Sequence, residues 1–582
     1  MRTCRTTPTL ALLLLFGVSI SGAATKEDFL IHEQLTAVPS TFVDLGPASP
    51  EQVLALRLAL TPRDPGALEK TLYAVSTPGT PSYGKHLTKT EADLLVAPSA
   101  ESLSAVTSWL SGHNVSYDAA STARDWLSVN VTVSQANALF NANFSSFTER
   151  ETGVTAVRAR EYALPASLRQ HIEFVHPITT FPVRPSRGLK AFRSSNRREA
   201  LPFQQTVSDL AGRADIPVGC NRTVTPVCLQ SMYGIPSANA TQPSNRIAVT
   251  GFDGEIANVT DIQLFLRTYR PDLDASAVPS FVSIDGGITT NPDDLPAGGE
   301  ACLDLEWTMG VASNVPVTFI SAGTDGPGPG YLELDVFNSI LAQEHPPHVV
   351  TTSYSYNEGL QLTEPLMRKL CSLFGLLGAR GTTVIFSSGD GGVQGGGNVN
   401  DCTTFVPTFP STCPYVTSVG ATAYVPPGEI PFPYSSGGFS NIFPTPAFQR
   451  SAVQSYVQRL GDTYAGLYNA SGRGFPDLAI AGVDMVLAFN GVARNGGGGT
   501  SYSAPVIASI VALLNDELIG KGRRPLGWLN PLLYSAPWAF NDIQTGHMTG
   551  CGTTGFNATA GWDPASGLGS PKYAELRKAV GL

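Results

Sequence analysis

The sequence predicts an α/β protein with a buried parallel sheet, preceded by a smaller α+β domain. Beyond residue 230, helix-like segments alternate with four short apolar runs, at 247–252, 317–322, 349–353 and 383–386. Short apolar runs separated by helices are typical of parallel strands that are buried on both faces. Before residue 180, a strand-like alternation at 127–131 is followed by a helix-like stretch at 134–140. This earlier stretch predicts the smaller domain.

Composition limits the classes of function. The chain has 582 residues, of which 42% are apolar and 14% are charged, and its formal net charge is −10. The apolar share is enough for sizeable cores and excludes a disordered chain. A net negative chain lacks the basic face that phosphate binding needs, so nucleic acid is not an expected partner.

The first residues have the pattern of a secretion signal. Arg2 and Arg5 precede an apolar run at 10–20, and small residues follow at 21–24. This order is that of a signal peptide, which we place at residues 1–23. The apolar run is too short to cross a bilayer, which takes about 20 residues. We therefore expect a secreted, extracellular protein in an acidic milieu, with no membrane partner.

Cysteines and glycosylation motifs agree with secretion. Of the eight cysteines, Cys4 leaves with the leader and the other seven lie beyond residue 219. An oxidising compartment favours disulfides, but an odd number leaves at least one cysteine free or paired between molecules. Cys220 and Cys228 are close enough in sequence for a small closed loop, and the other pairings stay open. Asn-x-Ser/Thr motifs occur at Asn114, Asn130, Asn143, Asn221, Asn239, Asn258, Asn469 and Asn557.

A basic segment divides the chain into two units. Residues 184–198 carry six basic side chains and no acidic one, together with Pro, Gly and Ser. Residues 25–180 hold no cysteine, in contrast to the unit that follows. The basic segment is either a plain interdomain linker or a linker that is made to be cut. We favour the cleavable linker.

The strongest chemical motif is a glycine-rich stretch that ends in Thr500 and Ser501 and precedes an apolar run at 506–514. It predicts a serine at the start of a buried helix, where backbone N–H groups lie near its hydroxyl. Gly-Thr-Ser-x-x-x-Pro resembles the nucleophile segment of subtilisin-like peptidases, and the plainer interpretation is a helix-capping serine. A subtilisin-type triad also needs a histidine base. The histidines beyond residue 200 are outside any His-Gly-Thr segment, and they are His345, His348 and His547.

Carboxylates offer a different base. Glu300 and Asp304 are four residues apart, so they share one face of a predicted helix. Two neighbouring carboxyls can share a proton, because like-charge repulsion separates their pKa values. Asp390 follows an apolar strand in the sequence Ser-Ser-Gly-Asp-Gly. Taken singly, the pair is interpreted as a solvated helix face and Asp390 as a turn residue.

Together, Glu-x-x-x-Asp, Ser-Gly-Asp and Gly-Thr-Ser, in this order, resemble the sedolisin or serine-carboxyl peptidase family. Residues 81–88 and 127–147 look like the family's pro-domain, and residues 220–236 look like the start of the mature enzyme in its fungal tripeptidyl-peptidase branch. The resemblance implies a subtilisin-like parallel sheet with flanking helices. It also implies a pro-domain with a cleavable linker at 24–199 and a peptidase catalytic domain at 200–582.

Carried over residue by residue, the resemblance makes Ser501 the nucleophile, Glu300 its general base, Asp304 the residue that orients Glu300, and Asp390 the oxyanion-hole donor. A base with the ordinary glutamate pKa of about 4.3 suits acidic conditions. An aspartate can donate to an oxyanion only when it is protonated. We therefore expect activity in acid and its loss near neutrality. One departure is Ser355, which stands where the family's substrate-binding segment often has Gly.

Two loops near the C-terminus suit a structural calcium ion. Asp542 and Asp563 supply carboxylates within glycine-containing turns, and Ca²⁺ takes about six or more oxygen ligands. No Cys/His cluster in the sequence fits zinc. The resemblance places the ligands at the carboxylates of Asp542 and Asp563 and at the carbonyl oxygens of Ile543, Thr559 and Gly561.

The sequence therefore predicts a secreted, acid-acting serine-carboxyl peptidase, made as a zymogen, that releases tripeptides from free N-termini. The alternatives are an acid endopeptidase of the same family and a catalytically inactive binding protein on the same fold. The expected partners are peptide and protein substrates and the chain's own pro-domain. We expect a monomer.

Overall fold

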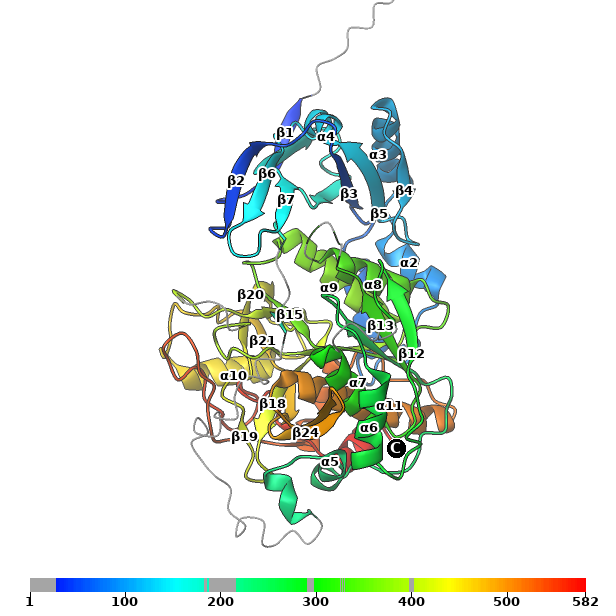
Figure 1. Cartoon of the computed structure of the whole chain (residues 1–582), viewed down its shortest axis with the longest axis vertical. Helices are drawn as coiled ribbons and strands as arrows, with labels where there is room; N and C mark the ends of the chain where they lie inside the picture. The colour runs from blue at the N-terminus through cyan, green and yellow to red at the C-terminus, as the bar shows by residue number, and fades with distance from the viewer. Residues whose placement is uncertain are drawn as a thin grey trace, which may run out of the picture.

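The computed structural model describes residues 28–182, 186–187, 216–289, 298–324, 326, 328, 330–396 and 402–582. The expected signal peptide at 1–23 and most of the basic segment at 184–198 lie outside these described residues. Figure 1 shows two parts: an N-terminal domain, drawn in blue and cyan, and a larger domain beneath it, with α8 and α9 facing the N-terminal domain.

The N-terminal part is a small α+β domain, as predicted. Its four-stranded antiparallel sheet, ordered β4-β5-β3-β9, packs against α3 and α4. Short polar side chains start the helices: Ser99 caps α3, and Thr88 and Thr132 form capping boxes with Glu91 and Gln135 at α2 and α4. The elements are β1 (Phe29–Gln34), β2 (Phe42–Pro47), β3 (Val53–Leu60), α1 (Ala67–Ser76), α2 (Lys89–Val96), α3 (Ala100–Gly112), β4 (Tyr117–Ala119), β5 (Trp126–Thr132), α4 (Val133–Leu139), β6 (Ser145–Glu149), β7 (Thr155–Arg158), β8 (Glu161–Pro165) and β9 (Ile172–His176).

The larger part is an α/β domain built on an eight-stranded sheet. The strand order is β12-β13-β11-β14-β16-β18-β19, with β22 also paired to β18. All pairs are parallel except that of β18 with β19. The predicted fold class is confirmed, and the four predicted apolar runs are β11, β13, β14 and β16. The strands are β11 (Ile247–Gly251), β12 (Ser280–Ile284), β13 (Val317–Ala322), β14 (Val349–Thr352), β16 (Thr383–Ser387), β18 (Thr417–Ala423), β19 (Ile430–Pro431) and β22 (Leu478–Ala481).

Helices cover both faces of this sheet, because successive residues of a strand point to opposite faces. In β11, Val249 packs in the core that contains α7 and α11, whereas Ala248 packs in the core that contains α8 and α9. Burial on both faces explains why these strands are continuous apolar runs. The helices are α5 (Pro226–Tyr233), α6 (Val259–Tyr269), α7 (Gly299–Ala312), α8 (Tyr331–Leu341), α9 (Glu364–Ala379), α10 (Arg450–Leu460), α11 (Thr500–Gly520), α12 (Asn530–Ser535) and α13 (Tyr573–Ala579).

Short strands and two 3₁₀ turns complete the larger domain. Among the described helices, α11 alone is long and apolar enough to cross a membrane, and most of it is buried within this domain. The remaining elements are β10 (Ser186–Arg187), β15 (Tyr354–Asn357), β17 (Thr408–Phe409), β20 (Gly438–Pro444), β21 (Gly472–Phe475), β23 (Met485–Phe489), β24 (Val492–Gly497), β25 (Phe540–Asn541), β26 (Ser570–Pro571), and the turns Val218–Asn221 and Pro537–Ala539.

Charged and apolar contacts join the two domains. Lys369 on α9 lies 3.0 Å from Asp125 and 3.2 Å from Glu173 of the N-terminal domain. Arg57 on β3 pairs with Asp335 on α8 at 2.6 Å. Apolar side chains of the N-terminal domain also belong to the core that α8 and α9 share with the sheet. The N-terminal domain is therefore seated on these two helices.

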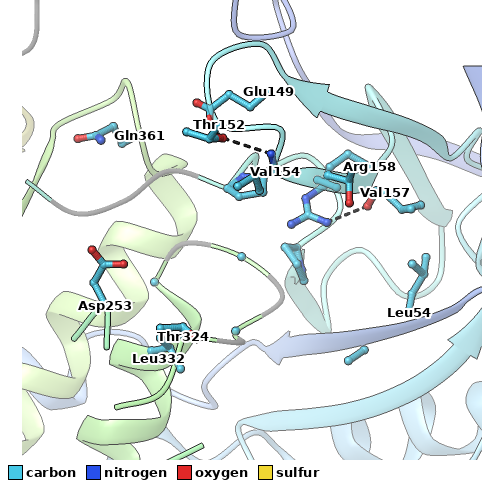
Figure 2. A pocket seen from close by; sticks show the side chains of 18 of the residues that line it. Leu54, Glu149, Thr152, Val154, Val157, Arg158, Asp253, Thr324, Leu332 and Gln361 are labelled. Atoms are coloured by element: carbon cyan, nitrogen blue, oxygen red, sulfur yellow. Dashed lines mark hydrogen bonds between the residues drawn. The ribbon is translucent and has the colours of Figure 1, made fainter. Parts of the chain in front are cut away.

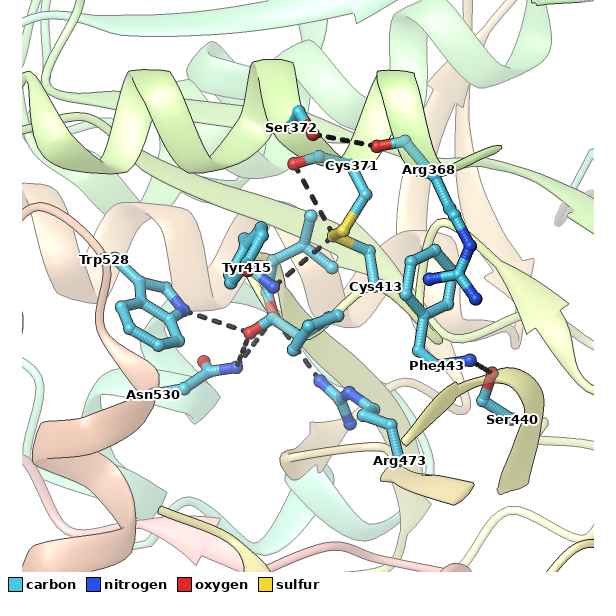
Figure 3. The surroundings of a disulfide bond; sticks show 12 residues. Arg368, Cys371, Ser372, Cys413, Tyr415, Ser440, Phe443, Arg473, Trp528 and Asn530 are labelled. Atoms are coloured by element: carbon cyan, nitrogen blue, oxygen red, sulfur yellow. Dashed lines mark hydrogen bonds between the residues drawn. A yellow bond between two sulfur atoms is a disulfide. The ribbon is translucent and has the colours of Figure 1, made fainter. Parts of the chain in front are cut away.

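Three disulfides hold the larger domain, and they join Cys220 to Cys228, Cys371 to Cys413, and Cys402 to Cys551. Figure 3 shows the second of them, which ties α9 to the segment after β17. Cys302 is free and buried, the only such cysteine in the described chain. The expected small loop and the expected unpaired cysteine are both confirmed.

Candidate active site

The four candidate catalytic side chains meet where α7, α11 and the loop after β16 converge. Glu300 and Asp304 lie in the first turns of α7, and Ser501 is the second residue of α11. Asp390 follows the carboxyl end of β16. Glu300 interacts with the charges of Asp304 and Asp390 and with the hydroxyl of Ser501. The structure thus gathers the set at the carboxyl end of the sheet, the usual place for sites in α/β folds.

Both carboxyls on α7 are buried, with exposed fractions of 0% for Glu300 and 1% for Asp304. Burial, reinforced by Asp304, raises the pKa of Glu300 well above its ordinary value, and the Ser501 hydroxyl opposes this rise. Burial likewise raises the pKa of Asp304, against the hydrogen bond from Ser353. The expectation of an ordinary glutamate pKa is therefore wrong for this closed structure, and so is the solvated-face interpretation. Two buried carboxyls this near each other do not readily ionise together, because like charges repel.

Asp390 is held by the residue that precedes the serine. Its Oδ1 accepts hydrogen bonds from the N–H of Thr500 at 2.8 Å and from the Thr500 hydroxyl at 3.0 Å. The N–H of Gly389 donates to Thr500 Oγ1 at 3.1 Å. Gly389 has a φ of +105°, and a Cβ there would lie 3.0 Å from Ser436 Oγ, so this turn requires glycine. The turn fixes the carboxyl of Asp390 at the start of α11.

The Ser501 hydroxyl lies beside Glu300 without a hydrogen bond of standard geometry, and within the described residues neither group has another hydrogen-bond partner. The hydroxyl is nevertheless near enough to lower the pKa of Glu300. Such contacts are often long before substrate binds and tighten in the complex.

Two histidines of the catalytic domain can be placed relative to this site. His348 precedes β14, at the opposite end of the sheet from Asp390, and His547 Nδ1 lies 2.9 Å from the carbonyl oxygen of Met548.

Comparison with known proteins decides the family. Residues 40–181 match the family described as Pro-kumamolisin, activation domain, and residues 287–521 match the Subtilase family. Tripeptidyl-peptidase SED2 of Arthroderma otae is 33% identical over 606 residues, which cover 97% of this chain and 98% of that protein. The chain belongs to the sedolisin family of serine-carboxyl peptidases.

Two further relatives agree with this membership. Aorsin of Aspergillus oryzae is 32% identical over 655 residues, which cover 97% of both chains. Pseudomonas sedolisin, a serine-carboxyl proteinase solved with two molecules of pseudo-iodotyrostatin, has a TM-score of 0.51 and 22% identity, and the match covers 62% of this chain and 98% of that one. The latter shows a common fold. This sedolisin is thus a serine-type peptidase that carries an activation domain.

A wall of the cleft begins next to the two acids. Ser353, immediately before β15, donates its hydroxyl to Asp304 Oδ1 at 2.8 Å. On the other side of β15 from β17 lies β10, a piece of the basic segment, in antiparallel register with Ser186 opposite Ser355. As residue numbers rise, β10 therefore runs toward Ser353 and the acids. Ser186 and Arg187 of the basic segment therefore lie against the strand that the family resemblance assigns to substrate backbone.

A second feature lies beside the N-terminal domain, away from the four candidate catalytic residues, none of which lines it. A cavity of about 750 Å³ lies between the two domains. Figure 2 shows Arg158 and Val154 of the activation domain on one side, with Asp253 and Thr324 of the larger domain on the other. Asp253 follows β11 and Thr324 follows β13, so the cavity lies above the carboxyl ends of these strands. Substrate that approaches from this side meets the activation domain.

One acidic neighbour of the site is missed by the sequence analysis. Glu255 is 5% exposed, and its Oε2 accepts the N–H of Ala301 at 3.3 Å. Its charge raises the pKa of both Glu300 and Asp304. The available signal was its position, since it follows the apolar run at 247–252 and the carboxyl ends of parallel strands meet at one edge of the sheet.

The two C-terminal loops expected to bind calcium lie together. The N–H of Gly561 donates to both carboxylate oxygens of Asp542, at 3.1 and 3.0 Å. Asp563 is 0% exposed and accepts the N–H of Thr559 at 2.8 Å, and burial raises its pKa to about 8. In the described ranges no three or more His, Cys, Asp or Glu side chains cluster as metal ligands. The fit to calcium thus rests on two carboxylates and backbone carbonyls, which are hard oxygen donors of the kind Ca²⁺ prefers.

Proposed function

We propose that this sedolisin is a secreted, acid-acting zymogen whose mature form removes tripeptides from free N-termini. The supporting observation is the grouping of Glu300, Ser501 and Asp390 in a chain that aligns along 97% of its length with a tripeptidyl-peptidase. The division proposed for the chain is a signal peptide at 1–23, a pro-domain with its linker at 24–199 and a catalytic domain at 200–582.

In the proposed reaction, Glu300 accepts the hydroxyl proton of Ser501 while Oγ attacks the carbonyl carbon of the substrate. The former carbonyl oxygen becomes negative, and protonated Asp390 donates a hydrogen bond to it. Glu300 then gives the proton to the leaving amine, the peptide C–N bond breaks, and a tripeptide remains as an ester on Ser501. Water, deprotonated by Glu300, attacks this ester. The bond between the carbonyl carbon and Ser501 Oγ then breaks, Glu300 returns the proton to Oγ, and the tripeptide is released.

The proposed reaction needs a proton on Asp390 and an ionised Glu300. Asp304 can hold the proton that the pair shares, which leaves Glu300 as the base. Burial among groups of the catalytic domain raises the pKa of Glu300 in this structure. In the proposed mature enzyme, water that enters the site lowers this pKa again, so the base becomes available in acid. Near neutrality, Asp390 ionises and no longer donates.

The pairing of β10 with β15 supports latency through the linker. A strand laid on this wall excludes substrate, and β10 runs from Ser186 to Arg187 in the direction of Ser353, which contacts Asp304. We propose that this linker is cut between about residues 184 and 205 when the precursor is acidified, which leaves a mature chain that starts shortly before Cys220.

We further propose a structural Ca²⁺ held by the carboxylates of Asp542 and Asp563 and by carbonyl oxygens of Ile543, Thr559 and Gly561. The ion would neutralise the buried charge of Asp563 and tie the two loops together. It has no part in the chemistry of the reaction.

The decisive experiment compares one peptide with a free and with an acetylated N-terminus, across pH, with products identified by mass. Release of tripeptides from the free peptide alone, and only in acid, is the expected result. Equal cleavage of the acetylated peptide at internal bonds would replace the tripeptidyl-peptidase by an acid endopeptidase. No cleavage of either peptide by the processed protein would favour an inactive binding protein.

A further inference from the structure

Thr500 contacts Asp390 from two directions. Its N–H and its hydroxyl both donate to Oδ1 of the aspartate, at 2.8 and 3.0 Å. The hydroxyl has one proton, which it gives to Oδ1, and it accepts the N–H of Gly389 at 3.1 Å. Thr500 is 0% exposed, so water does not compete for these groups. The direction of every hydrogen bond in this set is therefore fixed.

This arrangement determines which oxygen of Asp390 carries the acid proton. Oδ1 accepts hydrogen bonds from two donors, so a proton bound to Oδ1 would be repelled by the two donor protons that point at it. A carboxylic acid has one O–H and otherwise accepts, so the proton is placed on Oδ2. An oxyanion needs a donor in a fixed direction, because a donor that must reorient during the reaction contributes less.

The same contacts affect the pH at which the acid loses its proton. Donors aimed at a carboxylate stabilise its charged form, and the first N–H groups of α11 act in the same sense. Titratable groups of the described chain that face Asp390 include Glu300 from α7 and Tyr502 from α11. Glu300 opposes ionisation when it is charged, whereas the Thr500 hydroxyl favours it.

We propose that Thr500 is a positioning residue of this peptidase: its hydroxyl locks Oδ1 of Asp390 so that Oδ2 presents the proton to the oxyanion, and it thereby sets the alkaline limit of activity. The inference rests on the proposed role of Asp390. It adds a residue that touches neither the substrate nor the reacting atoms and that acts only through the aspartate.

The test uses the processed enzyme and its Thr500→Val variant, which keeps the shape and the N–H but lacks the hydroxyl. We expect kcat to fall by roughly 10- to 100-fold, with KM within about twofold, because the lost contact matters at the oxyanion. We also expect the alkaline limb of the pH profile to move up by roughly one unit, because the carboxylate loses a donor. Thr500→Ser keeps the donor and should retain both kcat and the limb.

Ser503→Ala is the matched control. Ser503 is one turn further along α11, is 0% exposed, and donates to the carbonyl oxygen of Ile480 at 3.1 Å. This variant loses a buried hydroxyl from the same helix without touching Asp390, so its melting temperature falls while its pH profile stays in place. If Thr500→Val does not fold, Thr500→Ala removes the same hydroxyl with less crowding and is measured instead.

Asp390→Ala, which removes the donor, separates the role of Asp390 from that of Thr500. If Asp390→Ala is inactive while Thr500→Val has a normal kcat and an unmoved limb, the positioning role is wrong and the role of Asp390 stands. If folded Asp390→Ala turns over normally, the proposed oxyanion donor itself is wrong. Thr500→Ser as damaged as Thr500→Val would also overturn the inference, because the hydroxyl would then not be the active feature.

Discussion

The ring of His86 in the activation domain lies directly against the backbone of Gly381 in the catalytic domain. A Cβ atom added to Gly381 would lie 2.6 Å from His86 Nδ1, and one added to Gly527 would lie 2.8 Å from His86 Nε2. Burial, aided by Arg524 and His348, lowers the pKa of His86 to about 4. Burial also lowers the pKa of His348 to about 4, aided by Arg246. The interface therefore holds two neutral imidazoles, with Arg524 near His86 and Arg246 near His348.

Acid should loosen this interface through His86. Once the domains separate, the ring regains water and an ordinary pKa near 6.5, so separation takes up a proton below that pH. Attachment is fully retained above pH 6.5 and weakens, by up to about tenfold per pH unit, as pH falls toward the bound pKa of about 4. His86→Gln removes this titration. We expect its self-processing, followed on denaturing gels, to need a lower pH than that of the wild type.

His113→Gln is the control for that experiment, because His113 is an exposed histidine at the end of α3. It should process at the same pH as the wild type. If the pH midpoint of self-processing is unchanged in both His86→Gln and His113→Gln, groups other than His86 control release of the activation domain.

Three substitutions test the catalytic assignment. Ser501→Ala, Glu300→Ala and Asp390→Ala should each lose most activity, and the loss of an oxyanion donor alone costs about 10²- to 10³-fold in kcat. Melting temperatures must show that each variant folds, since Glu300 is fully buried and its removal leaves a space. Turnover near the wild-type value in a folded variant would remove that residue from the assignment.

The sequence predicts a site residue where a chemical motif coincides with the end of a strand or the start of a helix. Ser501, Asp390 and the pair Glu300 and Asp304 stand in recognisable motifs at strand ends and helix starts, so their convergence follows from the order of the elements. The raised pKa of Glu300 cannot be predicted in this way, because it depends on how deeply segments distant in the chain bury α7. The contact of His86 with Gly381 is equally invisible to a local pattern, because the two residues lie in different domains.

Calcium should stabilise the catalytic domain. Asp542→Ala removes a ligand of the proposed ion and also the hydrogen bonds from Gly561, so only the part of its stability loss that depends on calcium is due to the ion. A ligand at 100 times its Kd adds about 2.7 kcal/mol to the native state. Protons compete for Asp563, whose pKa is raised to about 8, so the gain in Tm from calcium should shrink as pH falls. Asp462→Ala changes another exposed loop aspartate and should keep the full gain in Tm from calcium. A wild-type Tm that changes with neither calcium nor chelator would contradict a structural ion.

The precursor should cut its own linker when it is acidified. At neutral pH an ionised Asp390 cannot donate to an oxyanion, so the precursor should persist although β10 already lies on the wall at β15. Acid protonates Asp390 and charges His86 together, which activates the site and loosens the activation domain. Acidification of purified precursor should therefore cut the chain between about residues 184 and 205, as read by N-terminal sequencing of the product. The Ser501→Ala precursor should stay intact under the same treatment. If it matured as fast as the wild type with no other protease present, the linker would still be a cleavable one, but the enzyme that cuts it would be a different molecule.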